Sequence, residues 1–352
     1  MQNITYKVLV VTMVALVLVF VGLAITPSAL AGPFFFNTGD PDGKMGTGSR
    51  PASGGKIEIE SADDFVLTSG ATITSATFTG LLTGNASTVT QVGVEIYRVF
   101  PNDSNVGRTS GPPTFSTAQV PTRVNAPSDD AFDTRDSSAA TLSFTTQIIS
   151  NTFTVANTVL NGIHPKPNQT TGGEGPVTGQ EVLFTVTFTT PFSLPPGHYF
   201  FVPQVAVTGG EFLWLSAPRP IVPPGTPFPQ GNTDLQSWIR NENLAPDWLR
   251  VGTDIVGPPP TGGSAPTFNA AFSLTGFTVP AVAGEDPYIS IVGPDYLGNP
   301  FYFSEKHFQF MYNENASPFD IPATFGTFPR HLLTGQIDTG HQHEEMIDHR
   351  KR

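Results

Sequence analysis

Four aspartates lie close together in one short stretch of the sequence. They are Asp129, Asp130, Asp133 and Asp136. Calcium takes about six to eight oxygen ligands, which carboxylates in loops can supply. Carboxylates this close together also repel one another, and a bound cation relieves that repulsion. The stretch therefore predicts a calcium site, and calcium is the one cofactor that the sequence suggests. The alternative is ordinary turn chemistry, in which each aspartate accepts hydrogen bonds from nearby backbone amides.

A second set of metal-ligating residues lies near the C-terminus. His341, Glu345 and His349 follow one another at the spacing of successive helical turns, and His343 lies beside them. Imidazole and carboxylate groups together suit zinc, nickel or copper. These residues predict a transition-metal site, with a solvated and frayed chain end as the alternative.

Two tryptophans are candidates for carbohydrate binding. Trp238 and Trp248, if exposed on one face of a sheet, would stack against sugar rings. The alternative is that they belong to the hydrophobic core. We expect the core location for Trp214, which lies within the apolar segment Phe212-Leu213-Trp214-Leu215.

Catalytic signatures are few. Paired carboxylates could hydrolyse a glycosidic bond, and the candidates are Glu58, Glu60, Glu95, Glu181 and Glu211. Strand alternation places Glu58 and Glu60 on the same face, where we expect them to meet water. The sequence has no G-x-S-x-G or H-E-x-x-H motif, and only His164 and His198 precede the C-terminal region. We therefore expect no enzymatic activity, and a hydrolase is the third choice among functions.

The elements that must position these residues follow from the composition. The chain has 352 residues, with 35 Gly, 34 Pro and no cysteine. Glycine and proline break helices, whereas the abundant Thr, Val and Phe favour strands. The absence of cysteine excludes disulfides, zinc–thiolate sites, iron–sulfur clusters and thiol catalysis. A net charge of −12 without a basic cluster argues against binding to nucleic acid or to an anionic membrane surface.

Alternating apolar residues predict strands whose inner faces are buried together. The inward sets are Val92, Val94 and Ile96; Val182, Phe184, Val186 and Phe188; and Phe268, Ala270, Phe272 and Leu274. Short strands separated by Gly/Pro turns predict an all-β, antiparallel β-sandwich that is jelly-roll-like. We place this domain at residues 56–277, after an N-terminal arm at 32–55 and before a loosely structured, partly disordered C-terminal extension at 278–352.

The N-terminus predicts export. Lys7 precedes the apolar run Val8–Ile25, and Ala29-Leu30-Ala31 forms an A-x-A cleavage signal. We expect residues 1–31 to be a signal peptide that is removed after Sec-type export, leaving the protein secreted or at the cell surface. An uncleaved segment would instead anchor the chain, and this is the only membrane contact that we expect.

Four segments together resemble a group of secreted bacterial β-sandwich proteins. They are Ala62-Asp63-Asp64-Phe65, Leu194-Pro195-Pro196-Gly197-His198-Tyr199-Phe200, Trp238 with Asp247-Trp248, and Asn269-Ala270-Ala271-Phe272-Ser273-Leu274-Thr275-Gly276. The pattern, over roughly residues 35–277, is similar to the exported proteins that carry a PEP-CTERM sorting tail, also called choice-of-anchor domains. No apolar helix follows Val279-Pro280, so that tail is not recognisable here. The resemblance implies a jelly-roll-like sandwich at the cell surface or in the matrix.

These observations predict a non-enzymatic protein of the cell surface or extracellular matrix. Its expected partners are extracellular polysaccharide or surface proteins. A carbohydrate-binding module that presents aromatic side chains is the alternative.

Overall fold

The computed structural model of the chain describes residues 31–84, 86–104, 120–163 and 170–279, together with short strands at 288–291, 301–304 and 310–311. The chain divides into two compact units, Met1–Pro280 and Ala281–Arg352. The predicted signal peptide, apart from Ala31, lies outside the described residues. So does the sequence 312–352, which includes the four proposed transition-metal ligands.

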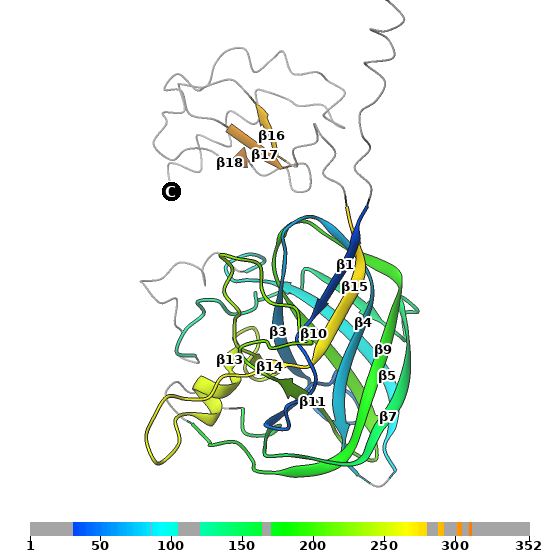
Figure 1. Cartoon of the computed structure of the whole chain (residues 1–352), viewed down its shortest axis with the longest axis vertical. Helices are drawn as coiled ribbons and strands as arrows, with labels where there is room; N and C mark the ends of the chain where they lie inside the picture. Colours follow the sequence, from blue (N-terminus) through cyan, green and yellow to red (C-terminus); the bar gives the residue numbers. More distant parts are fainter. Residues whose placement is uncertain are drawn as a thin grey trace, which may run out of the picture. The chain divides into compact units, whose positions relative to one another are not determined.

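The first unit contains two sheets, and the larger has nine strands (Figure 1). Six strands follow one another in space: β1 (Pro33–Asn37), β15 (Phe272–Thr278), β4 (Ala71–Leu82), β11 (Phe212–Ala217), β2 (Met45–Gly48) and β8 (Asn157–Val159). The others are β9 (Val177–Leu194), which pairs with β4, β7 (Leu142–Val155), which pairs with β9, and β14 (Asn269–Ala270), which pairs with β11. Every pair is antiparallel except β2 with β8.

The smaller sheet of this unit has six strands, all antiparallel to their neighbours. In spatial order they are β13 (Leu249–Arg250), β12 (Trp238–Asn241), β3 (Ile59–Leu67), β10 (Gly197–Thr208), β5 (Thr88–Arg98) and β6 (Asp133–Asp136). A short π-helix, η1 (Val251–Val256), follows β13. The described residues of the second unit form a three-stranded sheet of β16 (Tyr288–Ile291), β17 (Phe301–Ser304) and β18 (Phe310–Met311).

The main hydrophobic core lies between the two sheets of the first unit. Side chains from both sheets form it, and among them Phe78, Phe184 and Phe201 are fully buried. The rings of Phe78 and Phe184 stack with their centroids 4.8 Å apart. Packing is so close that a Cβ on Gly80 would lie 2.0 Å from Cε2 of Phe212. The predicted all-β sandwich is confirmed, as is the inward orientation of the alternating apolar sets.

Residues 32–55 depart from the sequence prediction. They were expected to form an arm, but they provide β1 and β2, which belong to the larger sheet. Strand β2 was missed because its sequence, Met-Gly-Thr-Gly, is rich in glycine, which is uncommon in strands. Its glycines are needed where neighbouring side chains approach closely. A Cβ on Gly48 would lie 2.6 Å from the side chain of Leu160. Glycine in a strand often marks such a close approach.

Within the described residues, no helix is both long enough and apolar enough to cross a bilayer.

The aromatic core gives the first prediction. Phe184→Ala removes a fully buried ring that contacts Phe78 and Phe212, so we expect the free energy of unfolding to fall by about 3–5 kcal/mol. Thr185→Ala, on the exposed side of the same strand, is the control and should cost about 1 kcal/mol or less. Urea unfolding measures both variants, and equal losses would contradict this assignment of the core.

Candidate functional site

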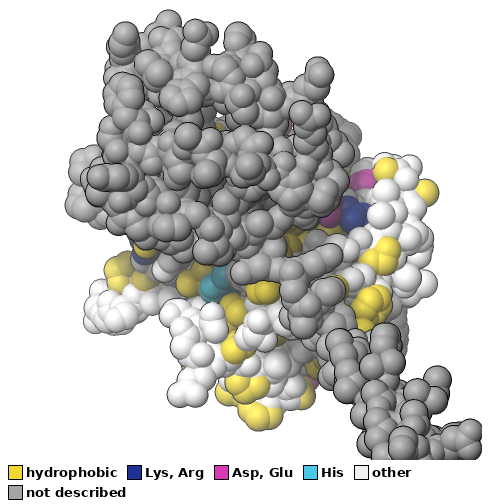
Figure 2. Space-filling view, turned by 90° about the horizontal axis from the view of Figure 1, so that it is seen from above, with side chains coloured by type: hydrophobic (Ala, Val, Ile, Leu, Met, Phe, Trp, Pro, Cys, Tyr) yellow, Lys and Arg dark blue, Asp and Glu magenta, His cyan; other side chains and the backbone are white. Residues whose placement is uncertain are grey.

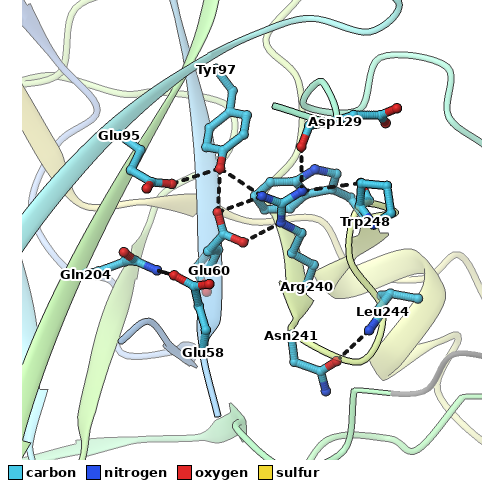
Figure 3. A network of polar contacts seen from close by, with 12 residues as sticks. Glu58, Glu60, Glu95, Tyr97, Asp129, Gln204, Arg240, Asn241, Leu244 and Trp248 are labelled. Carbon is cyan, nitrogen blue, oxygen red and sulfur yellow. Dashed lines mark hydrogen bonds and ion pairs between the residues drawn. The ribbon is translucent and has the colours of Figure 1, made fainter. Parts of the chain in front are cut away.

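A network of charged side chains occupies the face of the six-stranded sheet that points away from the main core (Figure 3). Glu60 comes from β3, Glu95 and Tyr97 from β5, and Arg240 from β12. Alternation places Glu95 and Tyr97 opposite to the buried core residues Val94 and Ile96. The network is therefore a consequence of strand register.

An ion pair between Arg240 and Glu60 is at the centre of the network. Nη2 of Arg240 lies 2.9 Å from Oε1 of Glu60, and Nε of Arg240 donates a short hydrogen bond to Oε2. Both side chains are buried, with relative exposures of 7% for Arg240 and 4% for Glu60. Two parallel N–H···O bonds of this kind are the strongest geometry for an arginine–carboxylate pair.

Tyr97 joins this ion pair to a second carboxyl group. Its hydroxyl lies 2.6 Å from Oε1 of Glu60 and 2.8 Å from Oε2 of Glu95, and it accepts a hydrogen bond from Nη2 of Arg240 at 2.8 Å. A phenol has one proton to donate. If Tyr97 donates to Glu60, the contact with Glu95 is satisfied when Glu95 is protonated and donates in turn.

The charges on this face agree with a protonated Glu95. Burial, and then the negative charge of Glu60, raise the pKa of Glu95 to about 8. Burial also raises the pKa of Glu58, which accepts a hydrogen bond from Nε2 of Gln204 at 2.8 Å. Burial would lower the pKa of Arg240, but the facing Glu60 raises it above its usual value. One guanidinium thus faces three carboxyl groups, and Glu95 keeps its proton near neutral pH.

Arg240 also holds two loops against the sheet. Its Nη1 donates to the carbonyl oxygen of Asp129 at 3.0 Å and to that of Pro246 at 3.3 Å. Its guanidinium lies 4.3 Å from the ring centroid of Trp248, whose Nε1 donates to the carbonyl oxygen of Ser128 at 3.1 Å. The loop before β6 and the loop between β12 and β13 are thereby fixed on the same cation.

The network contains two neighbouring carboxyl groups, as a glycosidase does, but a sugar has no access to them in this structure. Glycoside hydrolysis requires two carboxyl groups on either side of a sugar. Glu60 is 4% exposed and Tyr97 is 3% exposed, beneath the loop that contains Trp248. The polar groups of the network form their hydrogen bonds with other parts of the same chain. The network keeps a proton on Glu95 and anchors two loops to the sheet.

A second group of buried acids lies further along β3. Asp64 is 1% exposed; its Oδ2 lies 2.5 Å from Nε2 of His198 and accepts a hydrogen bond from the backbone amide of Leu235 at 3.1 Å. Burial raises the pKa of Asp64 well above its usual value and lowers that of His198 to about 4. Burial thus favours the neutral form of both groups. The neighbouring Asp63 accepts from the backbone amide of Ala270 and the hydroxyl of Ser237.

The four aspartates of the predicted calcium site do not come together. Asp133 pairs with Arg135, and Asp136 accepts hydrogen bonds from Gln91 and Ser138. The side chain of Asp129 is buried, whereas that of Asp130 is exposed. In the part of the chain that the structure describes, no group of three or more acidic or histidine side chains is arranged to hold a metal ion. Strand β6 forms in this stretch, and Asp133 and Asp136 have protein partners of their own, so the structure does not assemble the four side chains into the predicted calcium site.

The predicted sugar-binding tryptophans are likewise corrected. Trp238 is 1% exposed and Trp248 is 2% exposed, and both belong to a small cluster with Tyr97, Phe100 and Phe200. They cannot stack on a ligand in this structure. Trp214 is buried in the main core, as expected. The remaining carboxylate candidates lie elsewhere: Glu211 pairs with Arg50 and Lys56, and Glu181 is on β9.

One pocket of about 640 Å³ lies away from the network. Its described lining is made of Thr170, Thr171, Gly172, Val256, Gly257, Pro258, Pro259, Pro260, Ser264 and Pro266. None of these side chains titrates near neutral pH. The described lining of the pocket therefore brings no acid or base to a ligand.

Comparisons with known proteins give no relative for this arrangement. No protein-family model matches the chain, and neither do the curated proteins or the solved structures that were compared with it.

Sequence reasoning found the acids of the network but missed its cation. Glu58, Glu60 and Glu95 were recognised as carboxylates, yet Glu60 was expected to meet water. The available signal was the alternation Trp238-Ile239-Arg240, which places an arginine on the same strand face as a tryptophan. That pattern marks the face but not the partners, because the rings that Arg240 contacts are those of Tyr97 and Trp248.

The raised pKa of Glu95 predicts how stability depends on pH. The stability that protonated Glu95 contributes is fully present below about pH 4.5, where it is also protonated when unfolded, and is lost as the pH rises through about 8. Unfolding free energies measured from about pH 5 to about pH 9 should therefore fall more steeply for the natural protein than for Glu95→Gln. Parallel curves would show that Glu95 titrates normally.

Breaking the central ion pair gives a further prediction. Arg240→Met leaves Glu60 buried without its cation and should cost about 3–5 kcal/mol of unfolding free energy. Combining Arg240→Met with Glu60→Gln should cost less than the sum of the single changes, because the stranded charge is removed. Lys44→Met removes a surface ion pair with Asp42 and, as the control, should cost about 1 kcal/mol or less. Additive losses in denaturant unfolding would contradict a direct pairing.

Proposed function

We propose that the chain is a non-enzymatic protein of the cell surface or extracellular matrix, delivered by the N-terminal leader. One observation carries the proposal: the side chains best suited to chemistry are buried against one another. Glu60, Tyr97 and Arg240 are satisfied within the chain, and Trp238 and Trp248 lie in a hydrophobic cluster. Groups that act on a ligand must reach it.

The composition and the surface support the same function. The chain has no cysteine and few charged residues, 13% of the total. On the face seen in Figure 2, the described surface is made mainly of hydrophobic and uncharged polar side chains. A large sheet core provides stability without disulfides, which suits a protein that leaves the cell. The resemblance to exported PEP-CTERM-type sandwiches points in the same direction and is part of the proposal.

A glycoside hydrolase is the second candidate, favoured only by the adjacent carboxyl groups of Glu60 and Glu95. A carboxyl group whose pKa is raised to about 8, with a second carboxyl group beside it, resembles the arrangement of an acid and a nucleophile. For such an enzyme the loop that contains Trp248 would have to open.

A panel of extracellular polysaccharides separates these functions. Incubated with the full chain, the polysaccharides should release no reducing sugar. In affinity electrophoresis, the natural protein and a folded Trp248→Phe variant should migrate alike in gels that contain polysaccharide. Reducing sugar that is released by the natural protein and abolished by Glu95→Gln would replace the proposal with the hydrolase. Export is tested separately: the protein recovered outside a bacterial host should begin at Gly32, and retention inside the cells would contradict surface delivery.

A further inference from the structure

The edges of the two large sheets differ in how they are protected against further pairing. A strand at an edge leaves backbone N–H and C=O groups free to pair with another chain, and proteins limit this with short or charged edge strands. Five edge strands described here follow that rule: β8 has three residues, β13 and β14 have two each, β1 has five, and β6 has four, three of which are charged. The sixth, β7, does not.

β7 is a long and uncharged edge strand. It has 14 residues, Leu-Ser-Phe-Thr-Thr-Gln-Ile-Ile-Ser-Asn-Thr-Phe-Thr-Val, with no charge, proline or glycine. It pairs with β9 alone and follows it along the margin of the sheet (Figure 1). Its residues 145–149 are all exposed, and Ile148 and Ile149 are 54% and 51% exposed.

The first half of β7 is regular, and the second half is not. From Leu142 to Ile148 the strand follows β9 one residue for one residue. Register shifts then occur between Ile148 and Ser150 and between Ser150 and Phe153. Such irregularities disturb the outer edge as well and terminate pairing. The part of β7 able to accept another strand is therefore Leu142–Ile148.

We propose that Leu142–Ile148 pairs antiparallel with the same segment of a second copy of this chain, which joins the two nine-stranded sheets across a two-fold axis. Identical strands paired in this way place one residue opposite itself. With Thr145 at the axis, Leu142 faces Ile148, Ser143 faces Gln147, and Phe144 faces Thr146. The exposed Ile148 of each copy is then covered by an apolar neighbour, and the other face of the pair is uncharged and polar.

Charge favours a second copy as the occupant. The chain has a net charge of −12, so most approaches of one copy to another bring acids together. The segment Leu142–Ile148 has no charge, and its self-pairing places no like charges opposite each other. It also offers nothing to a basic or acidic partner. The inference does not depend on the proposed function, although a matrix protein would use such an assembly.

The cysteine-free chain allows a direct test. Thr145→Cys in the full chain places a single thiol at the axis, where antiparallel partners have Cα atoms about 4.5–5.5 Å apart, within the range of a disulfide. Mild oxidation should yield a disulfide-linked dimer in good yield on a non-reducing gel. Thr185→Cys is the matched control: Thr185 is exposed and lies beside Thr145 in the register of β7 with β9. The two Thr185 positions would be three strand spacings apart, about 14 Å, and should not cross-link.

A second variant tests the same pairing without a thiol. Gln147→Lys adds a charge at an exposed edge position, opposite Ser143 of the other copy, and charged edge residues oppose strand pairing. Sedimentation equilibrium should show the natural full chain approaching twice the monomer mass as concentration rises, and Gln147→Lys remaining monomeric with an unchanged circular dichroism spectrum. Equal cross-linking of the Thr145→Cys and Thr185→Cys chains, or a natural protein that stays monomeric, would overturn the proposal.

Discussion

The ion pair between Arg240 and Glu60 is the interaction on which the loops over the outer face of the six-stranded sheet depend. A buried carboxylate is costly unless a cation and hydrogen bonds compensate it. Arg240 provides both, and its remaining N–H groups bind the carbonyl oxygens of Asp129 and Pro246. The loop before β6 and the loop after β12 are thereby held over the six-stranded sheet, and Trp238 and Trp248 are buried there.

Both faces of the six-stranded sheet are consequently occupied. Phe65, Tyr199 and Phe201 face the larger sheet, and Tyr97, Phe200 and Trp238 face the loops. This explains why a residue set that could bind sugars or cleave them is instead internal. A sheet covered by its own loops gains rigidity and loses the open face that a binding module of the platform type requires.

The protonation of the buried carboxyl groups follows from the same shortage of positive charge. Three carboxyl groups near one guanidinium cannot all be ionised at low cost, so Glu95 remains protonated and Tyr97 relays its hydrogen bond to Glu60. Asp64 and His198 form a comparable neutral pair at the other end of β3. Buried acids of this kind stabilise the folded state more at mildly acidic pH than at basic pH. The exposed edge of β7 bears on the association of folded copies and not on this pH dependence.

The sequence alone determined the class of fold and the inner face of each strand. The alternation around Phe184 and Phe272 requires one buried face, and in a chain whose composition disfavours helices a second sheet can provide it. The glycine-rich β2 escaped prediction because its strand character depends on neighbours such as Leu160, distant in sequence. The predicted calcium and sugar-binding sites are not assembled in this structure for a related reason: residue type shows what a side chain can bind, but not what covers it. Whether Glu60 meets water or Arg240 depends on the register of β3 with β12, across 180 residues of chain. Only the tertiary structure decides that, because long-range pairing leaves no local signal in the sequence.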